Sequence, residues 1–241
     1  MVMLGAGTQF EPLRALRAAR TLASDPEDLP QVFTIIESLS GDTVERVRRR
    51  MATTETGQRL LAERPDIVDR LADRAALARL PDGSLGRAYL AFVEREQISA
   101  EGIRAAADEG MTHRRQLPAE LAYVHARMRD THDLWHAVVG YHGDVLGETA
   151  LLAFTFAQTW NPAIGLILAI GLVKTIGTPE ARKVILDGFR RGRRAAWLPA
   201  QDWEAMLALP LDEVRRQLRL EAPPQYTQIR PADLRARQAA A

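Results

Sequence analysis

Apolar residues recur along most of the chain at the three- and four-residue spacing of an amphipathic helix, whereas alternating strand patterns flanked by turn residues are hard to find. Pro162 and Pro179 suit the first position of a helix, and Asn161 and Thr178 directly before them suit the N-cap. We therefore expect an all-α fold, with helices over residues 12–23, 28–39, 43–52, 65–79, 87–108, 118–139, 144–160, 162–175, 179–194 and 211–220. These elements predict one helical-bundle domain over residues 1–222, followed by a mobile C-terminal tail over residues 223–241.

The longest stretch without a charged residue runs from Thr149 to Val173 and is long enough to span a membrane. Asn161 and Pro162 interrupt it near the middle, where one helix must end and another begin, so each apolar half is too short to cross a bilayer. This pattern predicts a buried helical hairpin. In the alternative, the two helices wall a pocket for a lipid chain or lie against a membrane.

Composition and charge argue against a nucleic-acid-binding protein, a cysteine-ligated metal site and a secreted protein. The 241 residues are 46% hydrophobic and 26% charged, which is typical of a folded protein, and the net charge of +1 gives no reason to expect a nucleic-acid partner. The chain has no cysteine, so a metal site would have to use His, Asp or Glu. The first residues lack the continuous apolar core of a secretory signal, and we expect a cytoplasmic protein.

The strongest chemical signal lies between His132 and Glu148. His132 and His136 are four residues apart, which places both imidazoles on one face of a helix, and Asp133 lies beside them. The sequence from Gly140 to Asp144 predicts a chain reversal that would bring Glu148, in the first turn of the next helix, back toward the histidines. Two imidazole nitrogens and one or two carboxylates predict a divalent metal site with open coordination positions. Imidazole ligands favour zinc or iron, whereas a site with mainly carboxylate ligands would favour magnesium.

The pattern His-Asp-x-x-His, with eleven residues between His136 and Glu148, resembles the signature of the ubiquinone biosynthesis protein family Coq-four. The resemblance extends over most of the chain. It is supported by Arg64-Pro65, by Leu80-Pro81-x-Gly83-Ser84-x-Gly86-Arg87-x-Tyr89, by Trp203, and by Pro210-Leu211-Asp212-Glu213-Val214-Arg215.

Membership of this family would imply an all-α, commonly dimeric protein that associates peripherally with the inner membrane and other quinone-biosynthesis proteins. It would imply a divalent metal, with zinc preferred, beside a pocket for a prenylated quinone precursor or another isoprenoid lipid. The reaction implied is oxidative removal of the ring carboxyl of a polyprenyl-hydroxybenzoate. Because no mitochondrial targeting sequence is seen, we expect a bacterial member.

Residue roles follow as hypotheses. His132, His136 and Glu148 would ligate the ion, and Asp133 would be a fourth ligand or a proton-transfer group. The apolar tail of the substrate would lie along four residues that are otherwise ordinary core, namely Leu151, Phe154, Leu166 and Ile170. A basic cluster would meet anionic lipid headgroups, unless it is a solvated helix end, and consists of Arg190, Arg191, Arg193 and Arg194.

Two other functions stay open at this point. His132-Asp133 is also the doublet of a metal-dependent phosphohydrolase of the His-Asp type, in which His125 and Asp144 would complete the metal set, although that interpretation leaves His136 and Glu148 without a role. The other alternative is a non-catalytic lipid-binding scaffold, in which the metal holds a prenyl lipid or an assembly without turnover.

Overall fold

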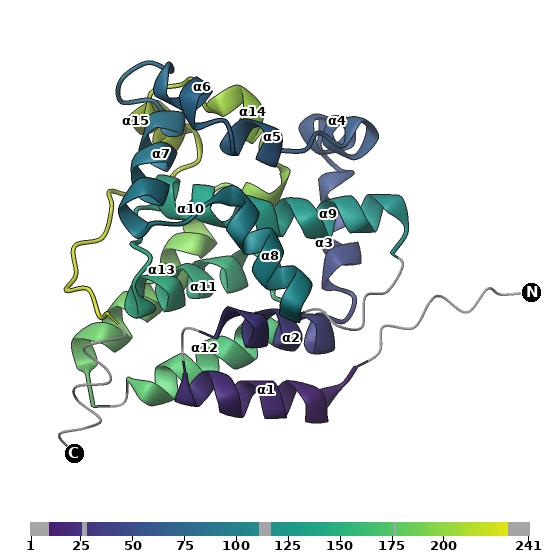
Figure 1. Cartoon of the computed structure of the whole chain (residues 1–241), viewed down its shortest axis with the longest axis vertical. Coiled ribbons are helices and arrows are strands. Elements are labelled where there is room, and N and C mark those ends of the chain that lie inside the picture. The colour runs from purple at the N-terminus through teal and green to yellow at the C-terminus, as the bar shows by residue number, and fades with distance from the viewer. Residues whose placement is uncertain (1–9, 26–27, 111–116, 176, 231–241) are drawn as a thin grey trace, which may run out of the picture.

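The computed structural model describes residues 10–25, 28–110, 117–175 and 177–230, and these residues form an all-α, single-domain fold without a named β-strand (Figure 1). A single antiparallel bridge joins Ser84 to Pro210 within the described residues. The all-α prediction is therefore confirmed. None of the helices in these ranges has the length and apolar character needed to cross a membrane.

The centre of the molecule is built from α10 (His132–Val139), α11 (Val145–Thr159) and α13 (Pro179–Arg194) (Figure 1). Helices α11 and α13 lie side by side, and glycines allow their close approach. A Cβ at Gly188 would stand 2.3 Å from the carbonyl oxygen of Ala150, and one at Gly192 would stand 2.5 Å from that of Phe154. Backbones this close leave no room for side chains between them, which fixes α11 against α13.

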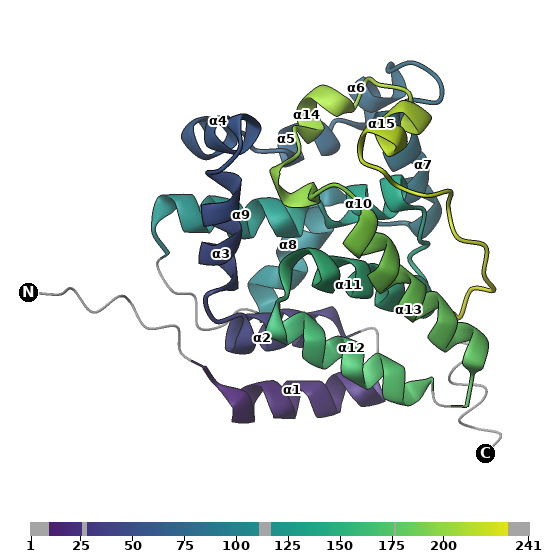
Figure 2. The ribbon, with the colours of Figure 1, turned by 180° about the vertical axis from the view of Figure 1, so that it is seen from behind.

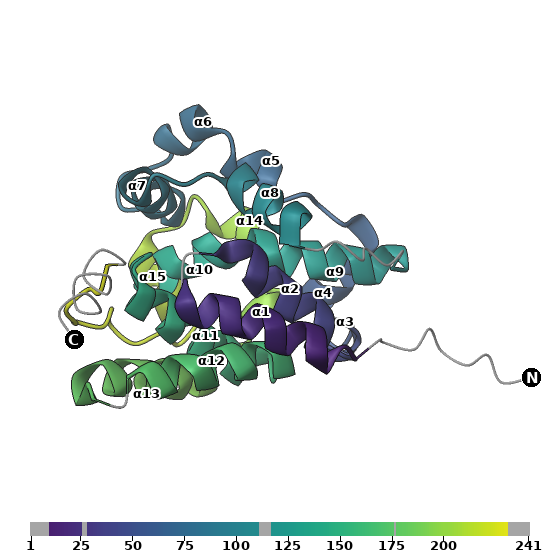
Figure 3. The ribbon, with the colours of Figure 1, turned by 60° about the horizontal axis from the view of Figure 1, so that its bottom comes forward.

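A layer of three helices covers one side of this centre: α1 (Pro12–Ser24), α2 (Leu29–Leu39) and α12 (Pro162–Lys174) (Figure 3). Their buried residues form a separate apolar cluster in which α1 contributes mainly alanines, and it contains Ala15, Ala18, Ala19, Leu22, Ile35, Leu39, Ala163 and Ile167. Small residues at helical spacing let α1 lie close to its neighbours. The break between α11 and α12 is where the sequence predicts it, because Trp160 takes a left-handed conformation and the Asn161 side chain accepts a hydrogen bond from the amide of Ala163.

The remaining helices surround the centre. They are α3 (Thr43–Met51), α4 (Glu55–Glu63), α5 (Val68–Leu71), α6 (Arg74–Ala78), α7 (Leu85–Glu96), α8 (Ala100–Gly110), α9 (Ala119–Asp130), the 3-10 turn η1 (Leu198–Ala200), α14 (Trp203–Met206) and α15 (Leu211–Gln217). Helix α7 packs against α10, and α15 packs against both, so these two helices bear on the site described below.

Three predicted long helices are each divided in two. The predicted helix over 87–108 breaks at Gln97, whose φ of 56° is left-handed, and the one over 118–139 breaks at Thr131. The one over 65–79 breaks at Asp73, whose side chain caps α6 by accepting a hydrogen bond from Ala76. The sequence prediction also missed α4, η1 and α14.

The prediction of a mobile tail from residue 223 is wrong for residues 223–230. This segment runs along the side of the molecule after α15, where Figure 2 shows it in yellow, and it packs against the start of α11. We call residues 223–230 the C-terminal strap. The rest of the predicted tail, residues 231–241, lies outside the described residues.

Candidate metal centre

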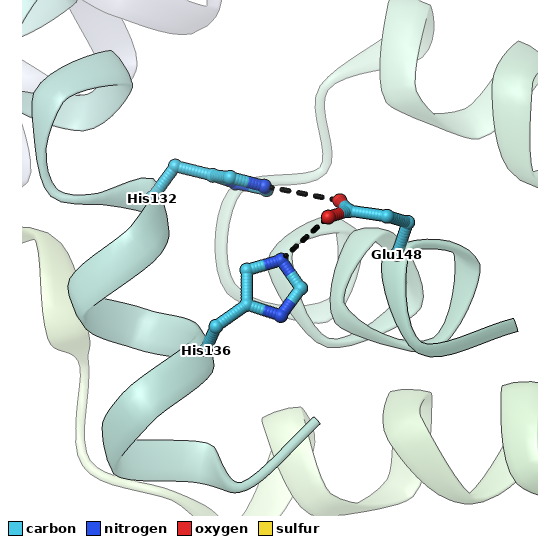
Figure 4. A group of neighbouring side chains, drawn as sticks. All are labelled: His132, His136 and Glu148. Atoms are coloured by element: carbon cyan, nitrogen blue, oxygen red, sulfur yellow. Dashed lines mark hydrogen bonds and ion pairs between the residues drawn. The ribbon is translucent and has the colours of Figure 1, made fainter. Parts of the chain in front are cut away.

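The site is formed by two helices joined by a short reversal. His132 and His136 lie one turn apart on α10, which ends at Gly140 with a φ of 93°. Asp144 then caps α11 by accepting a hydrogen bond from the amide of Leu146, and Glu148 follows in the first turn. The predicted reversal and N-cap are therefore confirmed, and they bring a carboxylate from α11 to the histidine face of α10 (Figure 4).

The three side chains converge on one point. His132 Nε2 lies 3.3 Å from Glu148 Oε2, and His136 Nε2 lies 3.1 Å from Glu148 Oε1 (Figure 4). One potential ligand atom from each residue falls within 4.8 Å of the others, and the two imidazole rings meet edge to face at 4.9 Å. Two nitrogens and one carboxylate in this arrangement fit the three-ligand set of a divalent cation with open positions for water or substrate.

His136 is held in the tautomer that a metal ligand needs. Its Nδ1 lies 3.1 Å from the carbonyl oxygen of Tyr141, and because a carbonyl only accepts, Nδ1 must donate its proton. In the neutral ring Nε2 then carries the lone pair. This Nε2 is buried and, despite its closeness to Glu148, has no partner with hydrogen-bond geometry. A lone pair facing a carboxylate calls for a cation between them, either a proton or a metal ion.

The charges of the triad are coupled. Partial burial opposes ionisation of Glu148, yet the attraction of His136 and a hydrogen bond from His132 lower its pKa. Burial likewise opposes a charge on His136, but Glu148 and Asp133 raise its pKa. Both shifts favour opposite charges on Glu148 and His136, and a bound cation would take the place of a proton on His136.

Asp133 lies next to the triad and is not part of it. The group of mutually close ligand atoms contains His132, His136 and Glu148 without Asp133. Burial raises the pKa of Asp133, partly against the attraction of the two histidines, and its charge contributes to raising the pKa of the buried Tyr89. A carboxyl with a raised pKa that lies beside the cluster of ligand atoms and outside it suits the predicted proton-transfer role better than ligation.

The four residues predicted to hold a lipid tail do not come together. Leu151 and Phe154 are fully buried in the main core, where α11 packs against α13. Leu166 and Ile170 are partly buried on α12 and pack against the separate cluster of α1 and α2. The prediction that these four line one pocket is wrong, because α12 turns away from the site to cover another layer.

The prediction for Arg191 as a membrane contact is also wrong. Its side chain is buried, and its terminal nitrogen donates 2.9 Å to the carbonyl of Val139, at the C-terminus of α10. The same nitrogen reaches the carbonyls of Glu221 and Ala222, and the guanidinium lies over the ring of Tyr141. Arg191 therefore anchors α10 from inside the core.

The other three arginines of the basic cluster are exposed. Arg194 forms an ion pair with Glu221 at 2.8 Å, and Arg193 lies over the ring of Trp160. Arg190 stays available to solvent. Headgroup contact stays a prediction for these three.

Several residues that shape the site were not predicted to do so. Arg215 donates to the carbonyl of Val138 at 2.9 Å, so it also anchors the end of α10, and Phe92 of α7 stacks on His136 with ring centroids 5.0 Å apart. Arg215 belongs to one of the segments that carried the family resemblance, so the sequence offered a signal for it. Nothing in the sequence links Phe92 to the histidines.

The set required by a His-Asp phosphohydrolase is not assembled. Asp144 is buried, and its carboxylate is occupied by the amides of Leu146 and Ile229 and by the hydroxyl of Tyr226. Among the described residues, the cluster of ligand atoms includes neither Asp144 nor His125. The geometry therefore favours the triad with His136 and Glu148 over this alternative.

Fold and triad together define a helical protein with a candidate divalent-cation site of two imidazoles and one carboxylate. A family model described as "Coenzyme Q (ubiquinone) biosynthesis protein Coq4" matches residues 11–224. The chain belongs to the Coq4 family, which confirms the resemblance noted in the sequence.

Individual relatives agree with this assignment. The mitochondrial ubiquinone biosynthesis protein coq4 of Aspergillus clavatus is 35% identical over 190 residues, which are 77% of this chain and 63% of the relative. The corresponding protein of Paracoccidioides brasiliensis is 34% identical over 204 residues, 81% of this chain and 67% of the relative. The chain thus spans less than two thirds of the length of the first curated relatives.

A solved structure shares the fold. It is the 2.85 Å crystal structure of a Nostoc punctiforme PCC 73102 protein provisionally assigned to ubiquinone biosynthesis. It matches with a TM-score of 0.61 and 26% identity, covering 87% of this chain and 98% of the other.

Proposed function

We propose that this chain acts in ubiquinone biosynthesis as a metal-dependent enzyme that removes the C1 carboxyl of a polyprenyl-hydroxybenzoate. The observation that carries the proposal is the convergence of His132, His136 and Glu148, with His136 Nε2 buried and without a hydrogen-bond partner. Membership of the Coq4 family supports a substrate from ubiquinone biosynthesis, and two imidazoles with one carboxylate support metal-dependent chemistry.

In this proposal the three residues hold a divalent cation, zinc by preference, with iron or magnesium as alternatives. A bound cation would supply Lewis acidity, stabilising the negative charge that develops on the substrate as carbon dioxide leaves. Glu148 is 42% exposed, so the cluster is accessible on the carboxylate side. Iron would be the ion suited to the oxidative form, in which carbon dioxide leaves, one atom of dioxygen becomes the hydroxyl that replaces the carboxyl, and a two-electron donor reduces the other atom to water.

Asp133 would handle the proton. In the non-oxidative form the bond between C1 and the carboxyl carbon breaks, carbon dioxide leaves, and C1 must receive a proton. Burial raises the pKa of Asp133, and a raised pKa suits a carboxyl that would deliver this proton. Asp133→Asn should therefore slow turnover while leaving the bound metal in place.

Contact with lipid and partners is a further part of the proposal. Large apolar side chains are exposed near the N-terminus, with Leu13 at 72% and Leu16 at 48% on α1, and Phe10 at 63% just before it. These favour a protein that lies peripherally on the inner membrane, collects a prenylated precursor there and pairs with a second copy or other quinone-biosynthesis proteins. A scaffold without turnover is the second candidate that this surface supports.

Metal analysis of purified protein, together with mass spectrometry of co-purified lipid, tests the proposal on wild type, His132→Ala and Glu148→Gln. We expect about one metal ion per chain and a prenyl lipid in the wild type, loss of the metal in both variants, and turnover of a prenylated hydroxybenzoate by wild type alone. His125→Asn is the matched histidine control and should keep the metal.

Other outcomes discriminate the candidates. Wild type without metal and without prenyl lipid would overturn the proposal. Metal and lipid without turnover would favour the scaffold. Loss of metal in His125→Asn with full retention in Glu148→Gln would favour the His-Asp phosphohydrolase.

A further inference from the structure

The C-terminal strap is fastened to the first turn of α11, the helix that carries Glu148. The Tyr226 hydroxyl donates to Asp144 Oδ2 at 2.9 Å and accepts from the amide of His142 at 3.0 Å. The backbone of Ile229 adds two hydrogen bonds. Its amide donates to the side-chain Oδ1 of Asp144 at 2.8 Å, and its carbonyl accepts from the amide of Val145 at 3.0 Å. Four hydrogen bonds thus converge on the reversal and the N-cap of α11.

Two glycines, Gly140 and Gly147, leave space for the strap to pack against the reversal and α11. A Cβ on Gly147, the residue before Glu148, would stand 2.4 Å from the Tyr226 hydroxyl and 2.1 Å from the carbonyl oxygen of His142. A Cβ on Gly140 would stand 2.7 Å from the Cβ of Pro223. Real Cβ atoms essentially never come within 3.0 Å of such neighbours, so both glycines are needed for the strap to lie this close.

The far end of the strap is fastened to α7. Arg230 forms an ion pair with Glu96 at 2.9 Å, and the Glu96 side chain is only 5% exposed. Helix α7 also carries Phe92, which stacks on His136. The strap therefore connects the helix behind the histidines to the helix that presents the carboxylate.

We propose that the strap is a positioning element for Glu148, with Tyr226 as its central residue. The amide of Glu148 donates to the carbonyl of Asp144 at 2.8 Å, so whatever holds Asp144 sets where Glu148 begins. With the strap docked, the carboxylate meets the two histidines. With the strap loosened, the first turn of α11 frays and the third ligand is lost from its place. This inference rests on the proposed metal site.

The family model matches residues 11–224, so Tyr226, Ile229 and Arg230 lie outside the matched segment. Residues outside the first coordination sphere that orient a ligand typically change metal affinity by about 10- to 100-fold.

The test uses the full chain and three proteins: wild type, Tyr226→Phe and Tyr123→Phe. Tyr123 is a partly buried tyrosine on α9 that packs against the apolar cluster of α3 and α4, so its variant removes a hydroxyl away from the strap. Affinity for Zn²⁺ is measured by competition with a chelator, and the coordination of Co²⁺ is followed by its visible absorption. Amide hydrogen exchange of residues 145–148 is measured on metal-free protein.

We expect Tyr226→Phe to weaken Zn²⁺ binding by about 10- to 100-fold, to alter the Co²⁺ bands and to speed exchange over residues 145–148, with Tyr123→Phe like wild type. Unchanged affinity in Tyr226→Phe would overturn the inference. Equal losses of affinity and melting temperature in both variants would overturn it too, because affinity would then only follow stability.

Failure of the proposed function gives a different result from failure of the inference alone. A wild type that binds neither Zn²⁺ nor Co²⁺ would overturn the metal site and this inference together. A wild type that binds both, with Tyr226→Phe binding equally well, would overturn the positioning role and leave the metal site standing.

Discussion

Helix α10 and helix α11 both carry part of the triad, but the structure holds them in different ways. The end of α10 lies in the core, where Arg191 of α13 and Arg215 of α15 donate to the carbonyls of Val139 and Val138. The start of α11 is held by the strap, through the carboxylate of Asp144. The exposure of the two side chains differs in the same way, because His136 is fully buried and Glu148 is 42% exposed.

We therefore call the α10 side of the site, with His136, the fixed side, and the α11 side, with Glu148 and the strap, the adjustable side. The imidazole of His136 is determined by contacts that form whenever the core forms, including the Tyr141 carbonyl and the Phe92 ring. The carboxylate depends on a segment that contributes little to the main core. Changes on the α10 side should therefore act on folding and binding together, whereas changes on the strap should act mainly on binding.

The helix dipoles favour both the arginines at the C-terminus of α10 and Asp144 at the N-terminus of α11. The C-terminus of a helix carries partial negative charge and its last carbonyls lack partners within the helix, so buried guanidinium groups stabilise α10 there. The N-terminus carries partial positive charge, which favours the anionic Asp144 as the cap of α11. Opposite charges thus hold the two ends that meet at the site.

The largest expected effect is on the fixed side. His136→Ala removes a buried ligand that no neighbouring side chain replaces in the triad. We expect Zn²⁺ affinity to fall about 1000-fold, close to 4 kcal/mol, as measured by chelator competition. Affinity within tenfold of wild type would mean that α10 does not supply the buried ligand, and the comparison between the two helices would lose its basis.

Arg191→Met should show the next largest effect, on folding. It leaves the buried carbonyl of Val139 and those of Glu221 and Ala222 without their donor. We expect a loss of about 3 kcal/mol in the free energy of unfolding, measured by urea denaturation. Arg190→Met is the matched control, because Arg190 is the neighbouring arginine and its side chain is exposed. Its free energy of unfolding should stay within about 0.5 kcal/mol of wild type. Equal effects in the two variants would contradict the anchoring role.

Gly147→Ala tests the adjustable side with a smaller change. Alanine normally stabilises a helix relative to glycine by roughly 0.5–1 kcal/mol, but here its Cβ would collide with the carbonyl of His142 and with Tyr226. We expect the sign to reverse, with a loss of about 2 kcal/mol by urea denaturation and weaker Zn²⁺ binding. Gly102→Ala on α8 meets only Ser99 at 3.6 Å and should stabilise. A stabilised Gly147→Ala would show that the strap does not pack as described.

The sequence predicted that His132, His136 and Glu148 converge, because helical periodicity and capping are local, although it also counted Asp133 as a possible member of the cluster. His132 and His136 at helical spacing, with Asp144 as a cap before Glu148, were sufficient to place three ligands together. The break at Asn161-Pro162 was readable for the same reason. By contrast, the breaks at Gln97 and Thr131 involve residues without a strong turn preference, and tertiary packing decides them.

Long-range partners escaped prediction. Arg191 lies within a run of arginines that resembles a solvated helix end, and only the packing of α13 against α10 and α11 shows that one member is buried. The strap follows Pro223-Pro224 and has few apolar residues, so its composition indicates a free tail. Its attachment depends on Asp144, which is more than eighty residues away in the chain.

The pH dependence of metal stabilisation gives the finest test of the coupled triad. In metal-free protein the pKa of Glu148 is lowered from 4.5, so its contribution to stability is present above about pH 4.5 and is lost in more acidic solution. The pKa of His136 is raised from 6.5, so its contribution is present below about pH 6.5 and is lost as the pH rises through the raised value. Zinc requires the deprotonated imidazole and should bind more tightly over that same rise.

The gain in melting temperature on adding Zn²⁺ should therefore grow from pH 6 to pH 8, while the metal-free protein loses stability over the same interval. Thermal unfolding with and without Zn²⁺ at several pH values measures both trends. Glu148→Gln removes the charge that raises the pKa of His136, so its metal-free stability should vary less with pH. A gain that is the same at pH 6 and pH 8 would mean that no proton is displaced from His136, and the buried imidazole would then be a structural residue of the fixed side and not a ligand.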